Sequence, residues 1–126
     1  MIAEDNPALL RVTRFALERA GFSVLAAADG DQALTALRKD DGRVGMLITD
    51  QQMPKLTGLE LIAAVRQMPR FASLPVVLLT AKALELSHER VSDELGVARV
   101  LGKPFSPLEV ARIVADLMPG TPSRVT

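Results

Sequence analysis

Short apolar runs alternate with helical patterns along most of the chain, and this alternation restricts the possible folds more than any other feature. The runs at 45–49 and 76–79 are almost continuously apolar, which is typical of parallel strands buried on both faces. Shorter runs lie at 1–3, 22–27 and 97–101. Together with five intervening and following helices, these five strands predict an α/β fold: a doubly wound parallel sheet with right-handed crossovers and helices on both faces.

Length and composition are those of one globular domain. The chain has 126 residues, enough to bury a core without disulfides, and 48% of them are apolar. We expect the domain to span 1–118 and a flexible tail or linker stub to span 119–126. A net charge of zero predicts no nucleic-acid surface, and the lack of cysteine excludes thiol catalysis. Because no apolar run approaches membrane-spanning length, we expect a soluble, cytoplasmic protein.

The helical segments differ in how clearly the sequence marks them. Apolar residues at helical spacing predict helices at 8–20, around 33–37, at 59–68, at 83–95 and from 106 onward. The buried stripe expected in the first of these consists of Leu9, Val12, Phe15, Ala16 and Ala20. The last helix should begin after Ser106, with Pro107 at its first position and Glu109 completing a capping box. The segment 83–95 has few apolar residues, so we expect a partly exposed helix.

Polar residues follow four of the predicted strands at the point where each strand ends. Glu4 and Asp5 follow the first strand, Asp50 the third, Thr80 the fourth and Lys103 the fifth. The carboxyl ends of parallel strands share one edge of a sheet, so these side chains should converge there. Each residue alone is more often a turn, cap or solvated side chain than a reactive group. Their coincidence at one edge favours a functional site.

Three carboxylates that converge predict a cation between them. Two unit charges about 4 Å apart repel by about 4 kcal/mol at an effective dielectric constant of about 20. Oxygen ligands without cysteine favour a hard divalent cation, Mg²⁺ or Mn²⁺, over zinc or copper. A hydroxyl and an ammonium facing such a site are suited to a phosphoryl group, and a carboxylate can itself accept one as an aspartyl phosphate.

The residues at the strand ends, with their neighbours, resemble the receiver domain of two-component response regulators. The resemblance rests on Glu4–Pro7, Asp50-x-x-Met53-Pro54-x-x-x-Gly58, Thr80-Ala81 and Lys103-Pro104-Phe105. These motifs occur in the order found in that family, and the match extends from Met1 to about Leu117. The resemblance implies a flavodoxin-like fold with strand order 2-1-3-4-5.

The resemblance also implies how the acidic residues act. Asp50 would accept a phosphoryl group from the phosphohistidine of a sensor histidine kinase or a histidine phosphotransfer protein. Asp5, Asp50 and the backbone carbonyl of Gln52 would hold Mg²⁺ or Mn²⁺, and Glu4 would assist through a water molecule. The domain would thus be a phosphoryl acceptor that assists its own phosphorylation and dephosphorylation, not an enzyme acting on other substrates.

The phosphoryl group and the output have their own implied residues. Lys103, the Thr80 hydroxyl and the Ala81 backbone amide would contact the phosphoryl oxygens, while Gln52 and Lys82 would tune its lifetime. The phosphorylated state would be relayed by binding a downstream protein. The face formed by 84–117 is similar to the family's output surface, which implies a monomer or a weak dimer through that face.

Two features depart from the family pattern. The family usually has Tyr or Phe as a switch residue three positions before the lysine, where this chain has Val100, whose β-branched side chain cannot swing as an aromatic does. We therefore expect readout through the Thr80 to Ser92 region without an aromatic relay. The first strand has only Met1–Ala3 and would be central in the sheet, so we expect reduced stability or a coding sequence that starts further upstream.

Other functions would leave different marks on the sequence. A hydrolase of the haloacid dehalogenase type also forms an aspartyl phosphate, but it needs a second Asp at the position of Gln52. No G-x-G-x-x-G or P-loop pattern supports a nucleotide-binding module. An interaction module that works without phosphorylation stays open because of Val100. His88 and Lys55 are expected to be surface residues, and contact with a kinase is a minor alternative for Lys55.

Overall fold

The chain folds around a five-stranded parallel sheet in a computed structural model, which describes residues 1–81 and 94–118. The strands are β1 (Ile2–Ala3), β2 (Ala26–Ala27), β3 (Leu47–Asp50), β4 (Val76–Thr80) and β5 (Arg99–Gly102). Their order is β2-β1-β3-β4-β5, and every pair of neighbours is parallel. The flavodoxin-like, doubly wound sheet predicted from the sequence is confirmed.

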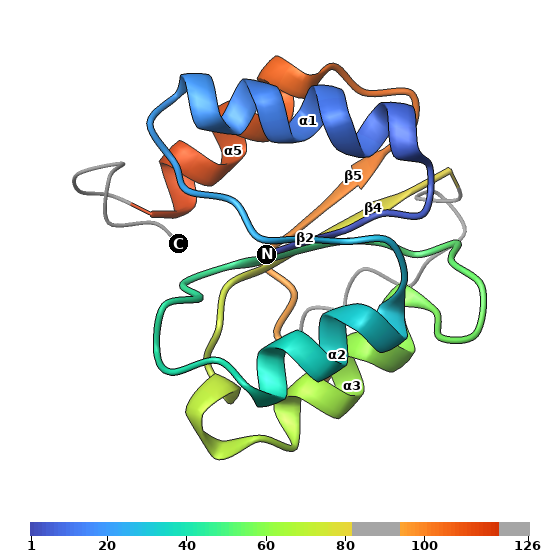
Figure 1. The fold of residues 1–126 in the computed structure, drawn as a ribbon, viewed down its shortest axis with the longest axis vertical. Helices are drawn as coiled ribbons and strands as arrows, with labels where there is room; N and C mark the ends of the chain where they lie inside the picture. Colours follow the sequence, from blue (N-terminus) through green and yellow to red (C-terminus); the bar gives the residue numbers. More distant parts are fainter. Residues whose placement is uncertain (82–93, 119–126) are drawn as a thin grey trace.

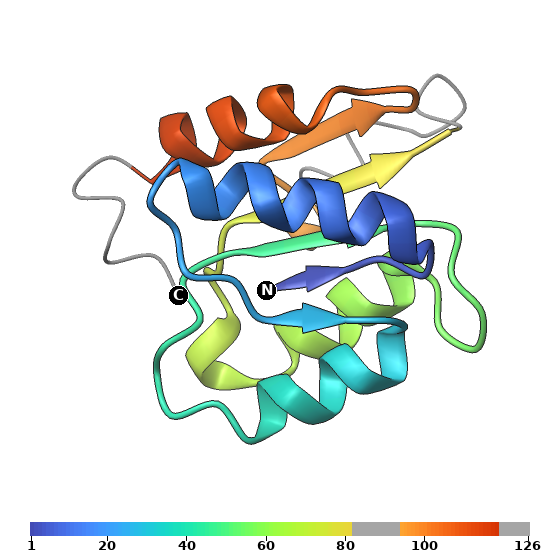
Figure 2. The same ribbon diagram turned by 45° about the horizontal axis from the view of Figure 1, so that its top comes forward.

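Helices cover both faces of this sheet. They are α1 (Pro7–Arg19), α2 (Gly30–Arg38), α3 (Gly58–Arg66) and α5 (Pro107–Leu117), with a short 3-10 helix, η1 (Pro69–Phe71), after α3. Figure 1 shows α1 and α5 on one face and α2 and α3 on the other, and Figure 2 shows all strands pointing the same way. Within the described residues, no helix has the length and apolar character needed to cross a membrane.

Two predicted segments fall largely or wholly outside the described residues. Of the helix predicted at 83–95, only Glu94 and Leu95 are described, and both are helical. The tail predicted at 119–126 lies entirely outside them. These two predictions therefore stay predictions, whereas the other four predicted helices are confirmed.

Alternation of side chains along the strands builds a core on each side of the sheet. In β4, Val76 and Leu78 belong to the core beneath α2 and α3, whereas Val77 and Leu79 belong to the core beneath α1 and α5. All residues of β3 and β4 are buried. Burial on both faces explains why these two strands are almost continuously apolar in the sequence.

Side-chain caps fix where each of the four described α-helices begins. The Asn6 side chain accepts hydrogen bonds from the first backbone amides of α1. The capping box predicted for Ser106 and Glu109 is confirmed at the start of α5, and Thr57 with Glu60 forms another at the start of α3. Each cap follows a loop at the carboxyl edge of the sheet, so the caps also limit how far these loops extend.

The predicted buried stripe of α1 is wrong by about one position. Thr13 and Leu17 are the buried residues of this helix, whereas Val12 and Phe15 are 47% and 60% exposed. Leu10, Thr13 and Leu17 also follow helical spacing, but a pattern of apolar residues gives no weight to a threonine. The face of α1 that packs against α5 is therefore rotated from the predicted one.

The second strand is shorter than predicted for 22–27 because its partner is short. In β1 only Ile2 and Ala3 pair with β2, and the same two residues pair with Ile48 and Thr49 of β3 on the other side. A ladder cannot extend past the end of its partner strand, so the earlier part of the predicted strand remains outside the ladder. The strand β1, which lies inside the sheet between β2 and β3, is as short as expected, while its effect on stability stays a prediction.

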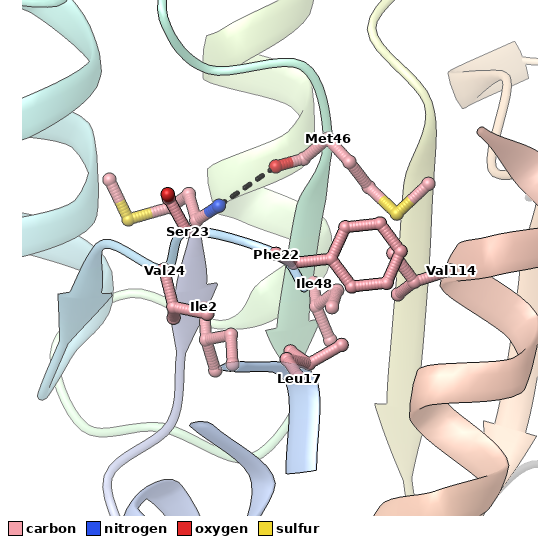
Figure 3. Close-up of a pocket in the computed structure, with 9 residues that line it drawn as sticks. Ile2, Leu17, Phe22, Ser23, Val24, Met46, Ile48 and Val114 are labelled. Atoms are coloured by element: carbon pink, nitrogen blue, oxygen red, sulfur yellow. Dashed lines mark hydrogen bonds between the residues drawn. The ribbon is translucent and has the colours of Figure 1, made fainter. Parts of the chain in front are cut away.

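A small cavity lies at the amino end of the strands, opposite the edge where the polar residues converge. Its volume is about 20 Å³, and its lining is mainly apolar, with Leu17 and Ile48 among the contributing side chains (Figure 3). The α-amino group of Met1 donates to the Met46 carbonyl at 3.0 Å, and burial lowers the pKa of this amine to about 6. The apolar lining makes this cavity a packing feature rather than a candidate reactive site.

Candidate functional site

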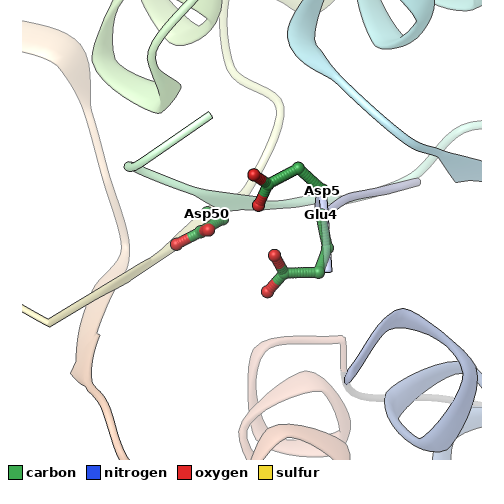
Figure 4. Close-up of side chains that lie close together, drawn as sticks. All are labelled: Glu4, Asp5 and Asp50. Carbon is green, nitrogen blue, oxygen red and sulfur yellow. The ribbon is translucent and has the colours of Figure 1, made fainter. Parts of the chain in front are cut away.

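The three predicted carboxylates converge at the carboxyl ends of β1 and β3. Glu4 and Asp5 directly follow β1, and Asp50 is the last residue of β3. One carboxylate oxygen of each lies within 4.8 Å of the others (Figure 4). Glu4 and Asp50 are only 2% and 1% exposed, whereas Asp5 is exposed. The cluster is therefore anchored in the fold and reaches solvent on its Asp5 side.

Lys103 brings a positive charge to this cluster from the loop after β5. Its Nζ atom lies 3.0 Å from Oδ1 of Asp50 and 3.4 Å from Oε1 of Glu4. The Asp50 contact is a close ion pair, but not a well-directed hydrogen bond. Partial burial alone would lower the pKa of Lys103, but the two carboxylates outweigh it and raise that pKa. The ammonium therefore stays charged and offsets part of the repulsion among the carboxylates.

Glu4 is a weak acid in this setting. Burial, together with the negative charge of Asp50, raises the pKa of Glu4 to about 7. The raised value persists although the Asn6 amide donates to Oε2 at 3.2 Å and Lys103 lies nearby, both of which favour the carboxylate. A cation bound beside Glu4 would shift the balance further toward the carboxylate form.

Thr80, at the end of β4, is fully buried beneath an exposed amide side chain. Its Oγ1 atom lies 3.2 Å from Nε2 and 3.4 Å from Oε1 of Gln52, which follows Asp50 by two residues. Its backbone carbonyl accepts a hydrogen bond from the Lys103 amide at 2.8 Å. The hydroxyl and the ammonium thus lie on adjacent strand ends, at the same edge as the acidic cluster.

Backbone packing holds the loop after Asp50 against the end of β3. The Gly58 amide donates to the Gln51 carbonyl at 3.1 Å, and the Gln51 side chain accepts from the Leu59 amide at 2.7 Å. A Cβ atom on Gly58 would overlap the carbonyl oxygen of Asp50, so only glycine fits this close approach. The start of α3 is thereby fixed relative to the acidic cluster.

The remaining predicted residues lie around this edge or outside the described residues. Ala81 is in an exposed turn directly after Thr80. Val100, partly buried in β5, packs against the core beneath α2 and α3. Lys55 lies in the exposed loop after Asp50 and has a φ of 70°. Lys82 and His88 fall outside the described residues.

Arg66 joins elements at the amino edge of the sheet, opposite the candidate site, and the sequence carries no signal for the contacts it makes. From the last residue of α3, its guanidinium donates to the carbonyls of Phe71, Leu95 and Gly96 at 2.8, 2.7 and 3.1 Å. An arginine in the last turn of a helix is common, so the sequence does not distinguish this one. The contact between Gln52 and Thr80 is likewise missing from the sequence prediction, which uses only the Gln52 backbone carbonyl and an effect on lifetime.

The donor set fits a hard divalent cation. The described cluster consists of carboxylates only, and their oxygens are close enough together for one ion to contact all three. Mg²⁺ prefers such oxygen ligands and usually keeps several waters, which the exposed side at Asp5 would admit. The edge therefore combines a cation site, a carboxylate, a hydroxyl and an ammonium.

Comparison with known proteins identifies the same family that the sequence motifs resemble. Residues 1–115 match the family model of the response regulator receiver domain. The chain is 40% identical over 118 residues to the transcriptional regulatory protein CpxR of Escherichia coli K12, covering 93% of this chain and 48% of CpxR. It is 34% identical over 114 residues to a 14.6 kDa protein from the sodA1 3′ region of Leptolyngbya boryana, covering 90% of this chain and 85% of that protein. The chain thus spans about half the length of CpxR.

Solved structures show the same fold. The chemotaxis response regulator CheY4 of Vibrio cholerae superposes with a TM-score of 0.81 and 28% identity, covering 93% of this chain and 95% of that one. The receiver domain of sensor histidine kinase PA1611 from Pseudomonas aeruginosa PAO1, which has magnesium coordinated in its active-site cleft, gives 0.76 and 29%, covering 91% and 92%. With a family match that extends over most of the fold and all of the acidic cluster, the chain belongs to the receiver domains of two-component response regulators.

Proposed function

We propose that the chain is a phosphoryl-accepting switch and that Asp50 is its acceptor. The observation that supports this most strongly is the placement of Asp50, whose side chain is almost fully buried yet lies 3.0 Å from the Lys103 ammonium and within the acidic cluster. A carboxylate oxygen of Asp50 would attack the phosphorus of a partner's phosphohistidine. The phosphorus–nitrogen bond would break, and the imidazole would leave with the bonding electrons and take up a proton.

The neighbouring side chains would hold the transferred group. Lys103 would offset the charge of its oxygens, and the Thr80 hydroxyl and the Ala81 backbone amide would donate to them. Asp5, Asp50 and the backbone carbonyl of Gln52 would hold Mg²⁺ or Mn²⁺, with Glu4 acting through water. When bound, the cation supplies charge neutralisation for the phosphoryl oxygens.

The partners follow from this chemistry. The donor would be a sensor histidine kinase or a histidine phosphotransfer protein, and the output would be altered affinity for a downstream protein in the cytoplasm. Direct nucleic-acid binding is not expected from a chain with no net charge. The readout through Thr80 to Ser92 and the weak dimer through 84–117 involve residues outside the described ones and stay predictions.

Two other functions are weaker. A haloacid dehalogenase type of hydrolase lacks its second acid, because Gln52 cannot titrate. A module that acts without phosphorylation is favoured only by Val100, which packs as an ordinary core side chain. The phosphorylation-independent module does not explain why a hydroxyl and an ammonium lie beside the acidic cluster.

Phosphorylation tests the proposal directly. Wild type, Asp50→Asn and the control Asp31→Asn, an exposed acid on α2, would be incubated with acetyl phosphate or a phosphorylated kinase, with Mg²⁺ or with EDTA. Intact-mass analysis should show one added phosphoryl group on wild type and on Asp31→Asn, only with Mg²⁺, and none on Asp50→Asn. Labelling that survives Asp50→Asn, or that does not need the metal, would refute the assignment.

A further inference from the structure

The contact between Gln52 and Thr80 brings an exposed side chain onto a fully buried hydroxyl. Both ends of the Gln52 amide are within hydrogen-bonding distance of Thr80 Oγ1, at 3.2 Å for Nε2 and 3.4 Å for Oε1. Thr80 is 0% exposed, while Gln52 is exposed. The Gln52 amide therefore lies between the buried hydroxyl and solvent.

The backbone around Gln52 is fixed, so the side chain is the part that can move. The Gln51 amide donates to the Leu79 carbonyl at 2.8 Å, and the Gln51 side chain accepts from the Leu59 amide. On the other side, Met53 is buried. Thr80, being β-branched, has few side-chain rotamers, so its hydroxyl moves between discrete positions.

A hydroxyl has one hydrogen, so Thr80 cannot donate both to Oε1 of Gln52 and to a phosphoryl group on Asp50. We propose that Gln52 is a positioning residue whose side chain competes with the phosphoryl group for the Thr80 hydroxyl and so opposes switching. This inference rests on the proposed function, in which Thr80 binds the phosphoryl oxygens. It concerns which partner the Thr80 hydroxyl binds, which is distinct from the lifetime of the phosphoryl bond.

The test compares wild type with Gln52→Met, which keeps the length of the side chain and removes its donor and acceptor. Binding of beryllofluoride with Mg²⁺, a non-covalent mimic of the phosphoryl group, would be measured by titration. Gln52→Met should tighten this binding about two- to tenfold, the range expected for loss of one competing hydrogen bond. In a Thr80→Ala background the same substitution should have no effect, because the hydroxyl is gone.

Controls separate this inference from the proposed function. Gln67→Met, the same chemical change at an exposed position after α3, should leave the affinity unchanged. The NMR signal of the Thr80 methyl group should shift in ligand-free Gln52→Met and not in Gln67→Met. Unchanged or weaker binding by Gln52→Met, or an effect that persists without the Thr80 hydroxyl, would overturn the inference while leaving the proposed function intact. Failure of wild type to bind beryllofluoride would instead refute the proposed function, and this inference with it.

Discussion

Lys103 and Asp50 form an ion pair across a strand that lies between their own strands. Lys103 follows β5 and Asp50 ends β3, yet Nζ and Oδ1 are 3.0 Å apart, with β4 between the two strands in the sheet. The ammonium also lies 3.4 Å from Glu4, which follows β1. One side chain therefore connects the ends of three strands by charge.

Removal of this ammonium should make the protein depend more on metal. In EDTA, Lys103→Met should lower the free energy of unfolding by about 1–3 kcal/mol, because Glu4 and Asp50 then face each other without a counter-charge. Added Mg²⁺ should stabilise the variant more than wild type, since the metal no longer competes with an ammonium. Thermal unfolding with and without Mg²⁺ measures this. Lys39→Met, at an exposed lysine after α2, is the control, and equal Mg²⁺ gains in all three proteins would contradict the prediction.

The raised pKa of Glu4 predicts a pH-dependent stability in metal-free protein. The unfolded side chain loses its proton near 4.5, whereas the folded one keeps it until about 7. The stabilising contribution is therefore complete below 4.5 and is lost as the pH rises through 7. Relative to Glu4→Gln, wild type should lose on the order of 1–3 kcal/mol over this range.

Denaturant unfolding at a series of pH values in EDTA would measure the effect of Glu4. Glu18→Gln, which alters an exposed acid on α1, should follow the wild-type pH dependence. Parallel curves for wild type and Glu4→Gln would show that Glu4 has an ordinary pKa. In saturating Mg²⁺ the difference should shrink, because a cation favours the carboxylate in the folded protein.

The change in stability on Gly58→Ala tests the close approach of Gly58 to Asp50, because helix propensity and steric overlap predict changes of opposite sign. Helix propensity alone would make Gly58→Ala stabilising by about 1 kcal/mol. The added Cβ would overlap the Asp50 carbonyl, so we expect destabilisation by roughly 1–3 kcal/mol and slower phosphoryl acceptance as Asp50 shifts. Gly42→Ala has open space around it and only its φ of 103° to oppose it, so it should not slow phosphorylation. A stability gain for Gly58→Ala would contradict the close approach.

Arg66 should control how firmly the chain is held just before β5. Arg66→Met removes hydrogen bonds to three backbone carbonyls and should destabilise the protein by about 1–3 kcal/mol. The Ala98 amide, which donates to Val76, should exchange with deuterium faster, while the Ile48 amide should exchange as in wild type. Arg112→Met, at an exposed arginine of α5, is the control. Equal exchange at Ala98 in both variants would show that Arg66 does not hold this segment.

The sequence predicts most of the fold because the strongest signals are local. β3 and β4 are buried on both faces and are therefore continuously apolar, and the Ser106 cap lies within a few residues of its partner. The length of β2 is different, because it depends on how many residues β1 offers. The buried face of α1 includes Thr13, and a pattern that counts only apolar residues does not detect a buried threonine.

The composition of the site is predicted better than its internal contacts. Strand ends share an edge in any parallel sheet, so Asp50, Thr80 and Lys103 could be placed together from their positions alone. The contact between Gln52 and Thr80 joins residues 28 positions apart and depends on the course of a loop, which no local pattern records. The three carbonyls bound by Arg66 are similarly determined by packing.

The two-residue β1 makes the sheet unequal in its resistance to opening. β1 shares two residue pairs with each neighbour, whereas β3 with β4 and β4 with β5 share four each. Fluctuations that separate β2 and β1 from the other three strands should therefore need less free energy than any other opening of the sheet. Asp5 follows β1 and Asp50 ends β3, so an ion bound between them would hold these two weakly paired strands together. The cation proposed for phosphoryl transfer would then also stabilise the sheet against local opening.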